Sequence, residues 1–360
     1  MKNILITGGA GFIGSNFIRY VLNNKPEANI VNLDLLTYAG SLENLTDLQD
    51  PDRHHFIKGD ICDRELIDQI LLENEIDLVV HFAAESHVDR SIHGPEAFIR
   101  TNILGTFTLL EAVRTYWKTE SQNIREDVHF HHISTDEVYG TLKPEDPAFS
   151  EQTQISPNSP YAASKAASDH LVSSYFHTYG LPVSITNCSN NYGPNQFPEK
   201  LIPLMILNAI EGKPLPIYGD GQQIRDWLYV EDHCRAIWAV IENGNPGSIY
   251  NVGGENQPSN LEIVQSISEI LDERLPDSAH KPHFSLVEHV KDRPGHDRRY
   301  AMNIEKIKKE LNWQPKVSLK EGLNKTIGWY LDHPDWVEKI RKHQEYQSWV
   351  KDNYQDRGNL

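Results

Sequence analysis

Two neighbouring carboxylic acids, Asp136 and Glu137, follow an apolar stretch in "HISTDEVYG", residues 132–140. Like charges this close separate their pKa values, so one carboxyl can stay protonated while the other ionises. Such a pair could supply both an acid and a base to one reaction. On an extended strand the two side chains would point to opposite faces, so the backbone must leave the strand if both serve one substrate. The alternative is that Asp136 caps a helical turn and Glu137 is solvated.

A second pair with chemical potential is Tyr161 and Lys165 in "PYAASKAASDH". Residues at i and i+4 share one face of a helix. A tyrosine with its ordinary pKa of about 10 is a poor base at neutral pH, but a neighbouring ammonium favours the phenolate. The phenolate can then remove a proton from an alcohol. Taken alone, this spacing is common, and the alternative is an exposed helix pair.

A glycine-rich loop, "ITGGAGFIGSNFI", places Gly8, Gly11 and Gly14 between an expected strand over residues 3–7 and an expected helix. Glycine lets the chain turn tightly and bring backbone amides close to a pyrophosphate at the helix N-terminus. Asp34 ends the next expected strand, twenty residues after Gly14. A carboxylate there accepts hydrogen bonds from a ribose diol and repels a 2′-phosphate, which predicts NAD rather than NADP. The positive nicotinamide ring would also favour the Tyr161 phenolate.

Other residues extend the expected dinucleotide site. Asp60, in "KGDI", could meet the adenine or cap the following helix, and the sequence leaves both readings open. The small residues of "FAAES", 82–86, would let a cofactor lie close to the end of a strand. The residues expected to contact NAD are Gly8, Gly11, Phe12, Ile13, Gly14, Asp34, Asp60, Ile61, Ala83, Ala84, Ser86, Thr101, Tyr161 and Lys165.

The elements that must position these residues alternate between short β-rich runs and helical stretches. This pattern predicts an α/β fold, a Rossmann-type doubly wound parallel sheet with helices on both faces. Strands buried on both faces are rich in Val, Ile and Leu, as are most of the expected ones. The expected strands are 3–7, 29–34, 55–58, 78–82, 129–134 and 184–188, and the expected helices are 14–23, 64–74, 95–116 and 161–179.

The amino-acid composition of the chain changes after residue 190, where stretches rich in proline, glycine and charged residues separate expected amphipathic helices. We expect residues 1–189 to form the NAD-binding domain and 190–360 to form mainly a smaller substrate-binding lobe. The two are expected to interleave, with a return to the first domain around 225–255 and a strand over 248–252 that rejoins its sheet.

Composition narrows the class of protein. A formal net charge of −17 argues against nucleic acid as a partner, because nucleic-acid binders need a basic face. No apolar run is long enough to cross a bilayer, and "MKNILITGG" predicts a first strand rather than a signal peptide.

The three cysteines form no C-x-x-C pair, which favours a reducing, cytoplasmic setting. The histidines of "HFHH" lack an obvious acidic co-ligand, so we expect them to pack within the fold and predict no metal.

The glycine loop, the Ser/Thr position before the carboxylates and Tyr161-x-x-x-Lys165 together resemble the extended branch of the short-chain dehydrogenase/reductase superfamily. Most members of that branch modify sugar nucleotides. The resemblance implies that Thr135 bridges substrate and Tyr161, and that Lys165 also holds the nicotinamide ribose. Ser134 is the other candidate for the bridging hydroxyl; Thr135 is preferred because it adjoins the carboxylate pair.

Longer motifs narrow the resemblance. "STDEVYG", "AAESHVDRS", "NNYGPNQFPEKLIP", "RDWLYVEDH" and "DRPGHDRRYA" are similar to the dTDP-glucose 4,6-dehydratase family over the chain up to at least Trp313. GDP-mannose dehydratases carry a single carboxylate at this place, so the pair favours the dTDP type. In the implied reaction, carbon 4 is oxidised to a ketone, water is eliminated across carbons 5 and 6, and hydride returns to carbon 6. The resemblance assigns Glu137 as the carbon-5 base and Asp136 as the acid for the leaving hydroxyl.

The resemblance also implies a nucleotide-sugar pocket and a homodimer formed through the helices over 95–116 and 161–179. The implied product is an intermediate in the synthesis of deoxysugars such as rhamnose. Rival readings are a UDP-sugar epimerase or decarboxylase, which would not need the carboxylate pair, and a catalytically silent dinucleotide sensor. The residues expected to contact dTDP-glucose are Ser86, Thr135, Asn190, Lys200, Leu201, Pro216, Ile217, Tyr218, Arg225, Asn260, Asp292, Arg293 and His296.

Overall fold

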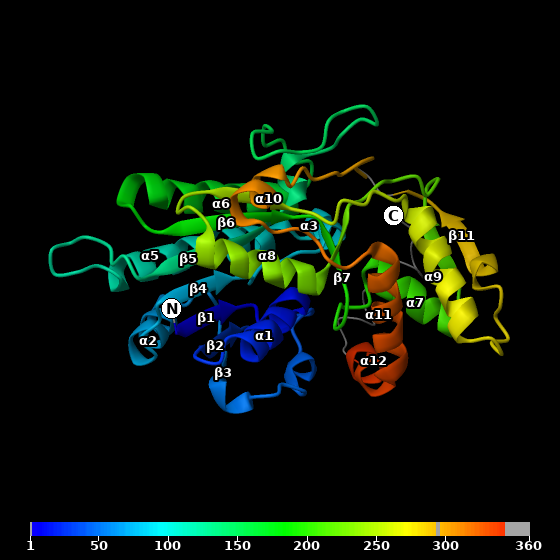
Figure 1. Cartoon of the computed structure of the whole chain (residues 1–360), viewed down its shortest axis with the longest axis horizontal. Coiled ribbons are helices and arrows are strands. Elements are labelled where there is room, and N and C mark those ends of the chain that lie inside the picture. The colour runs from blue at the N-terminus through cyan, green and yellow to red at the C-terminus, as the bar shows by residue number, and fades with distance from the viewer. Residues whose placement is uncertain (1, 293–295, 343–360) are drawn as a thin grey trace.

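Seven parallel strands form the main sheet of the computed structural model, which describes residues 2–292 and 296–342 (Figure 1). Each strand expected from the sequence is present, with ends that differ by at most one residue. Across the sheet the order is β10 (Ile249–Val252), β6 (Val183–Cys188), β5 (His129–Thr135), β4 (Leu78–His81), β1 (Asn3–Thr7), β2 (Asn29–Asp34) and β3 (His54–Lys58).

Strand order reverses direction at β1, because β2 lies on one side of it and β4 on the other. In open parallel sheets a crevice opens at this point, beyond the carboxyl ends of the strands. The glycine loop follows β1 and the small residues of "FAAES" follow β4. The topology therefore brings both motifs to one crevice, and the predicted doubly wound α/β fold is confirmed.

Helices cover both faces of the sheet. On one face α1 (Phe12–Asn24) lies beside α8 (Val230–Asn243), and their apolar side chains pack with those of β1. On the other face lie α2 (Arg64–Glu73), α5 (Thr106–Tyr116) and α6 (Pro160–Tyr179). Ser159 caps α6 by accepting a hydrogen bond from the Ala162 amide, and Gly180, with φ of 68°, ends the helix.

The helix expected over residues 95–116 is not regular. After α3 (Val88–His93) come α4 (Pro95–Phe98), a π-helical segment, η3 (Ile99–Gly105), and α5. Asn102 explains the irregularity, because its buried side chain accepts from the Glu85 amide and donates to the Glu85 carbonyl and to Ser164 Oγ. The wider turn thus ties the helix to the loop that follows β4, and single π turns of this kind recur at functional sites.

A smaller lobe carries its own apolar core, which includes Ile202, Ile206, Ile263 and Ile327. Its short strands pair in parallel, β7 with β9 and β8 with β11. In Figure 1 this lobe lies to the right of the main sheet. Its elements are β7 (Asn190–Tyr192), α7 (Leu201–Ile210), β8 (Leu215–Tyr218), β9 (Trp227–Tyr229), α9 (Asn260–Arg274), η5 (His283–Leu286), β11 (Val287–Val290), α11 (Leu319–Asp332) and α12 (Pro334–Arg341).

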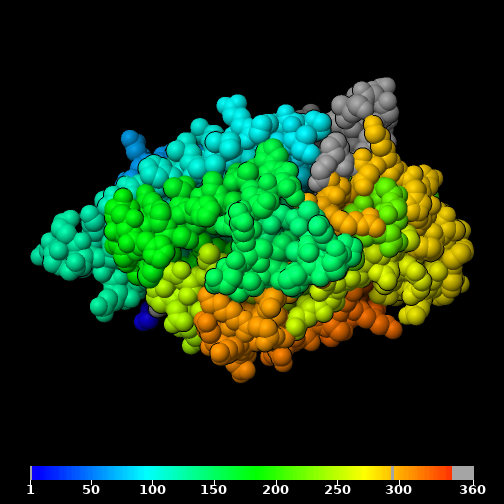
Figure 2. Space-filling view, turned by 90° about the horizontal axis from the view of Figure 1, so that it is seen from above, coloured from blue at the N-terminus to red at the C-terminus, as the bar shows by residue number. Residues whose placement is uncertain are grey.

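The chain crosses between the two parts several times. Residues 141–158 lie along the stretch that follows residue 296, where the Phe149 amide donates to Ala301 O and the Asn303 amide to Phe149 O (Figure 2). The division at residues 189 and 190 stays a prediction. The remaining short elements are η1 (Leu42–Leu45), η2 (Pro51–Arg53), η4 (Asp136–Tyr139) and α10 (Glu305–Leu311).

Within the described residues, none of the helices combines the length and apolar character needed to span a bilayer.

Candidate active site

One cavity at the carboxyl ends of β1 and β4 collects most of the predicted site. All the residues expected to contact NAD line it, and so do the three catalytic candidates at and just after the end of β5. Two further expected substrate contacts join them. The predicted residues on its wall are Gly8, Gly11, Phe12, Ile13, Gly14, Asp34, Asp60, Ile61, Ala83, Ala84, Ser86, Thr101, Thr135, Asp136, Glu137, Tyr161, Lys165, Asn190 and Lys200.

The glycine loop fits a pyrophosphate. Gly8 has φ of +74°, and a Cβ there would lie 2.6 Å from the Ala83 backbone nitrogen, so the turn packs directly on the end of β4. A Cβ on Gly14 would lie 2.3 Å from the Gly8 carbonyl oxygen. Gly11 is the N-cap of α1 and offers no side chain to its first amides. These amides can therefore receive an anionic group from the cavity.

Asp34 ends β2 at the cavity wall. One carboxylate oxygen accepts from the Ala10 amide at 2.9 Å and the other from the Leu36 amide at 2.8 Å. Burial raises the pKa of Asp34, and the two backbone hydrogen bonds oppose that shift. The carboxylate is held in place, as a group that orients a ribose diol must be.

Asp60 also lines the cavity, and its reading as a helix cap is wrong. Its oxygens accept from the Cys62 amide at 2.8 Å and from Arg100 at 3.0 Å. The cap of α2 is Asp63 instead, whose side chain accepts from the Leu66 amide. The other reading, in which Asp60 contacts the adenine, therefore remains.

The backbone leaves the strand where the carboxylate pair requires it. A 3-10 turn, η4, begins at Asp136, directly after β5. Thr135 caps this turn by accepting from the Glu137 amide at 3.3 Å. The alternative in which Asp136 caps the turn and Glu137 is solvated is therefore wrong, because Thr135 is the cap and Glu137 is only partly exposed.

The surroundings of Asp136 suit an acid. Burial raises the pKa of this carboxyl well above its usual range, and the negative charges of Glu137 and Asp226 raise it further. Arg225 opposes the shift, as does the Thr135 hydroxyl, which donates to Asp136 Oδ1 at 3.3 Å. This environment therefore favours the protonated form of Asp136.

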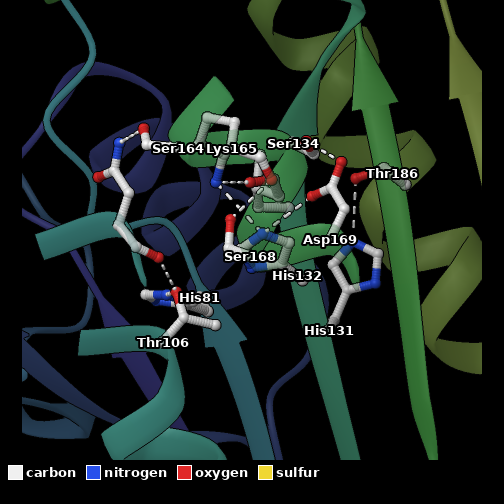
Figure 3. Close-up of polar contacts among 12 residues, drawn as sticks. His81, Thr106, His131, His132, Ser134, Ser164, Lys165, Ser168, Asp169 and Thr186 are labelled. Carbon is white, nitrogen blue, oxygen red and sulfur yellow. Dashed lines mark hydrogen bonds and ion pairs between the residues drawn. The ribbon is translucent and has the colours of Figure 1, made fainter. Parts of the chain in front are cut away.

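Tyr161 and Lys165 project from the first two turns of α6 and are both buried. Burial and the charge of Glu137 raise the pKa of Tyr161 well above its usual range, while its hydrogen bond with Thr135 lowers it. Burial lowers the pKa of Lys165 to about 8. Its ammonium donates to the Ile133 carbonyl at 2.7 Å (Figure 3).

The structure separates the two candidates for the bridging hydroxyl. Ser134 Oγ donates to Asp169 Oδ2 at 2.7 Å, beneath α6 and away from the carboxylate pair. Thr135 contacts both Asp136 and Tyr161. Its geometry agrees with the preference for Thr135.

The remaining expected substrate contacts within the described residues lie in the smaller lobe rather than on the cavity wall. Leu201 begins α7 beside Lys200, and Ile217 packs into the core of the lobe. Arg293 lies outside the described residues. The others, placed in β8, at the start of α9 or in neighbouring loops, are Pro216, Tyr218, Arg225, Asn260, Asp292 and His296.

Several lobe residues form a second polar group. The His296 ring lies 6.1 Å from the Tyr218 ring, and its Nδ1 is 2.6 Å from Asp292 Oδ1. Gln223 Nε2 donates to Asp292 Oδ2 at 3.0 Å, and the Gln223 carbonyl accepts from the Asn260 amide. These predicted residues are thus together, apart from the cavity wall.

Arg225 links this group to the catalytic carboxylates. It is 5% exposed, and its guanidinium lies 4.3 Å from the centre of the Tyr300 ring and donates to the Asp297 carbonyl. Its positive charge acts on Asp136, and Glu137 raises the pKa of Tyr300. Arg225 therefore brings a positive charge near Asp136, and Tyr300, which packs with residues of the main sheet, lies near the negative charge of Glu137.

Some residues that line the cavity were not predicted from the sequence. Gln196 and Phe197 line the cavity beside Asn190, although both lie in the motif "NNYGPNQFPEKLIP". Glu85, within "FAAES", was also overlooked. Position inside a motif that already carries predicted contacts was the available signal.

The histidines of "HFHH" make hydrogen bonds within the fold, as expected. His129 and His131 both reach Ser184 Oγ at 2.7 Å, and His131 also reaches Thr186. His132 lies beneath Lys165, with 3.2 Å between its Nε2 and the lysine Nζ. These contacts explain the histidines through sheet and helix packing.

Comparison with known proteins agrees with the sequence motifs. Residues 5–326 match the sequence model of the family described as GDP-mannose 4,6 dehydratase. The dTDP-glucose 4,6-dehydratase of Shigella flexneri is 53% identical over 98% of this chain and 99% of its own length.

Solved structures agree as well. The dTDP-glucose 4,6-dehydratase of Streptomyces venezuelae, with NAD bound, has a TM-score of 0.84 and 43% identity, covering 94% of this chain and 99% of that one. The Bacillus anthracis dTDP-glucose 4,6-dehydratase in complex with NAD has a TM-score of 0.82 and 44% identity, covering 94% and 100%. The chain therefore belongs to the GDP-mannose 4,6-dehydratase family, and over nearly its whole length it is similar to dTDP-glucose 4,6-dehydratases.

Proposed function

We propose that this chain is an NAD-dependent hydro-lyase that converts dTDP-glucose to dTDP-4-keto-6-deoxyglucose, for deoxysugar biosynthesis. The observation that carries the proposal is one cavity that joins a glycine-loop nucleotide site, the Tyr161–Lys165 pair and the carboxyls of Asp136 and Glu137. Relatives named for this activity are 53% identical to the chain and extend over its length.

Oxidation at carbon 4 begins with Tyr161. Its phenolate accepts the proton of the carbon-4 hydroxyl, and Thr135 aligns that hydroxyl with the phenol. Lys165 supplies the positive charge that favours the phenolate. Bound NAD supplies the hydride acceptor for carbon 4 and the hydride donor for carbon 6. Gly8, Gly11 and Asp34 would hold its pyrophosphate and ribose.

Elimination uses the carboxylate pair. A ketone at carbon 4 acidifies the hydrogen on carbon 5, which Glu137 removes. Asp136, whose pKa is raised by burial and by Glu137, donates its proton to the carbon-6 hydroxyl, and water leaves. The two acids have separate roles because their surroundings differ.

The nucleotide is bound between the cavity and the smaller lobe. Lys200 and Arg225 bring positive charge to the diphosphate in an otherwise acidic chain. Tyr218 and Pro216 border the thymine, and Ser86 contacts the sugar. Further contacts come from Asn190, Leu201, Ile217, Asn260, Asp292, Arg293 and His296.

The rival readings lack a use for the carboxylates. A UDP-sugar epimerase needs a tyrosine base and a hydride acceptor, and leaves Asp136 and Glu137 without a role. A silent dinucleotide sensor has no reason to bury an acid beside Tyr161. These residues therefore favour the dehydratase.

We further propose that the chain forms a homodimer in the cytoplasm. Ile99, Leu104 and Phe107 expose large apolar side chains along η3 and α5, on the helix pair expected to form the interface. An exposed row of this kind suits a second copy of the same helices. The three unpaired cysteines suit a reducing compartment.

Mass spectrometry tests the reaction. Purified protein is incubated with dTDP-glucose, with UDP-glucose and GDP-mannose in parallel. The expected product from dTDP-glucose is lighter by one water, with no added reductant consumed. An unchanged mass with altered stereochemistry would mean an epimerase, and no change in any sample despite bound NAD would favour a sensor.

A further inference from the structure

A row of three side chains on α6 continues past the proposed catalytic pair. Tyr161, Lys165 and Asp169 follow one another at intervals of four residues, so they share one face of the helix. That face packs on β5, where His132 and Ser134 point towards α6 (Figure 3). Lys165 is 4% exposed and Asp169 is 3% exposed. The row thus leads from the active site into the protein interior.

Short contacts connect Lys165 to Asp169 through the strand. His132 Nε2 lies 3.2 Å from Lys165 Nζ and 3.3 Å from Asp169 Oδ1. Ser134 Oγ donates to the other oxygen, Asp169 Oδ2, at 2.7 Å. The ammonium itself is held by the Ile133 carbonyl at 2.7 Å. One carboxylate oxygen is therefore fixed by Ser134, and the other lies next to the His132 ring that contacts the lysine.

Buried charges need partners, since an isolated ammonium or carboxylate in an apolar interior is costly. Burial lowers the pKa of Lys165 to about 8, and the charges of Asp169 and Cys188 oppose this. Burial also raises the pKa of Cys188 to about 12, so this thiol is neutral at pH 7. Among the described residues, Asp169 is thus the anion that acts on Lys165.

The neighbouring rings add no compensating charge. Burial lowers the pKa of His132 well below its usual range, so the imidazole is neutral. His81 of β4, whose ring centre lies 5.2 Å from that of His132, is neutral for the same reason. Burial raises the pKa of Asp169 to about 7, and Lys165 and Ser134 lower it. Support for the lysine charge therefore depends on Asp169 staying ionised.

We propose that Asp169, held by Ser134 and lying beside His132, is a positioning residue that keeps Lys165 protonated and aimed at the active site. This positioning role rests on the proposed roles of Tyr161 and Lys165 and adds a residue that lies deeper in the protein. A neutral amine at this position would keep the packing of α6 but could not stabilise the phenolate. Asp169 would thus act on catalysis through Lys165, without touching substrate or cofactor.

The test compares Asp169→Asn with the wild type, both loaded with NAD. Asparagine keeps the shape and an acceptor for Ser134 but removes the charge. Ultraviolet titration of tyrosinate, with Tyr161→Phe as the blank, is expected to find the Tyr161 phenolate forming at higher pH in the variant. At neutral pH, kcat is expected to fall by at least about tenfold, the effect of one pKa unit, with NAD still bound.

Controls separate charge from packing. Asp232→Asn removes another buried carboxylate, on α8, which accepts from the Lys316 and Val317 amides. It is expected to lower stability without moving the tyrosinate titration. Ser134→Ala removes a hydrogen bond that favours ionised Asp169, so it should move the titration in the same direction as Asp169→Asn, by less. Ser134→Ala also tests the proposal if Asp169→Asn does not fold.

The outcomes distinguish the two levels of proposal. If the wild type releases no dehydrated product from dTDP-glucose, the proposed function is wrong, and if Tyr161→Phe and Lys165→Met retain turnover, the catalytic roles proposed for these two residues are wrong. If both abolish turnover while Asp169→Asn and Ser134→Ala keep the wild-type titration and kcat, only the positioning role is overturned. A loss of kcat in Asp169→Asn with an unmoved titration would also overturn it, because packing alone would then explain the loss.

Discussion

Asp136 and Glu137 show how two adjacent residues of similar chemistry acquire different properties. Asp136 is 2% exposed beneath the turn it begins, whereas Glu137 is partly exposed on the same cavity wall. Burial and the neighbouring anion of Glu137 raise the pKa of Asp136. The difference in burial, rather than residue type, separates the two carboxyls and supports the proposed role of Asp136 as the acid.

Replacing single groups should stop the reaction at different points. In Tyr161→Phe, oxidation at carbon 4 is expected to be abolished, because the base is gone. In Glu137→Gln, oxidation should proceed but elimination should stop, leaving reduced cofactor on the enzyme. Near-ultraviolet absorbance of the reduced nicotinamide after mixing with dTDP-glucose distinguishes the two. Full turnover by Glu137→Gln would remove the role assigned to the carboxylate pair.

Asp226 should make stability depend on pH. This fully buried carboxyl accepts from the Gly254 and Met302 amides, yet burial raises its pKa to about 7. A raised folded pKa means that the folded state binds the proton more tightly than the unfolded state. Its stabilising effect is complete below the unfolded value and is lost as pH rises through the folded one.

Asp226→Asn removes that titration. Between about pH 5 and about pH 7, the free energy of unfolding of the variant is expected to rise by about 2 kcal/mol relative to the wild type. Urea denaturation at both pH values measures it. A constant difference between the two proteins would show that Asp226 does not titrate in this range.

At the scale of elements, the β1–α1 turn depends on backbone contact that only glycine allows. In Gly14→Ala, the new Cβ would lie 2.3 Å from the Gly8 carbonyl oxygen, which cannot move without opening the turn. We expect weaker NAD binding, by at least about tenfold, measured by calorimetry on protein freed of cofactor. Wild-type affinity would contradict the close packing.

Gly328→Ala provides the matched control for this variant. Gly328 lies within α11, and a Cβ there would meet Arg274 Nη1 at 3.2 Å, the far end of a flexible side chain. Alanine favours the helix by up to about 1 kcal/mol, so stability should be kept or gained and NAD binding unchanged. A loss of NAD affinity in this variant would point to a general effect of the substitution.

At the scale of the whole molecule, two parts with separate apolar cores meet near the carboxyls of Asp136 and Glu137. Arg225 and Tyr300, which follow β8 and β11 in the chain, act on the charges of Asp136 and Glu137 beyond β5. The acid–base pair is therefore a property of the assembled molecule. The same scale governs the proposed association of two copies through α5 and α6.

Phe107→Asp should disrupt the dimer, because it places a charge in the exposed apolar row of η3 and α5. We expect a monomer by light scattering coupled to size exclusion, at the same concentration at which the wild type is dimeric. Leu72→Asp, on α2, is the control, since Leu72 is also exposed, at 69%. An unchanged mass for Phe107→Asp would exclude this face as the interface.

The sequence by itself determined what depends on short spacing. The strands, the glycine loop, Asp34 and the Tyr161–Lys165 pair could be predicted because residues a few positions apart define turns, periodicity and helix faces. It also showed that the backbone must leave β5 at Asp136. The regular helix predicted over 95–116 was wrong because Asn102 makes tertiary hydrogen bonds that local periodicity does not contain.

Only the tertiary structure decided which of two adjacent groups does what. Ser134 hydrogen-bonds to Asp169, whereas Thr135 hydrogen-bonds to Tyr161. Asp63, not Asp60, is the N-cap of α2. The raised pKa of Asp136 and the burial of Lys165 also belong to this level. The physical reason is that burial and charge depend on elements distant in sequence, which exclude water from a site only after the chain has folded.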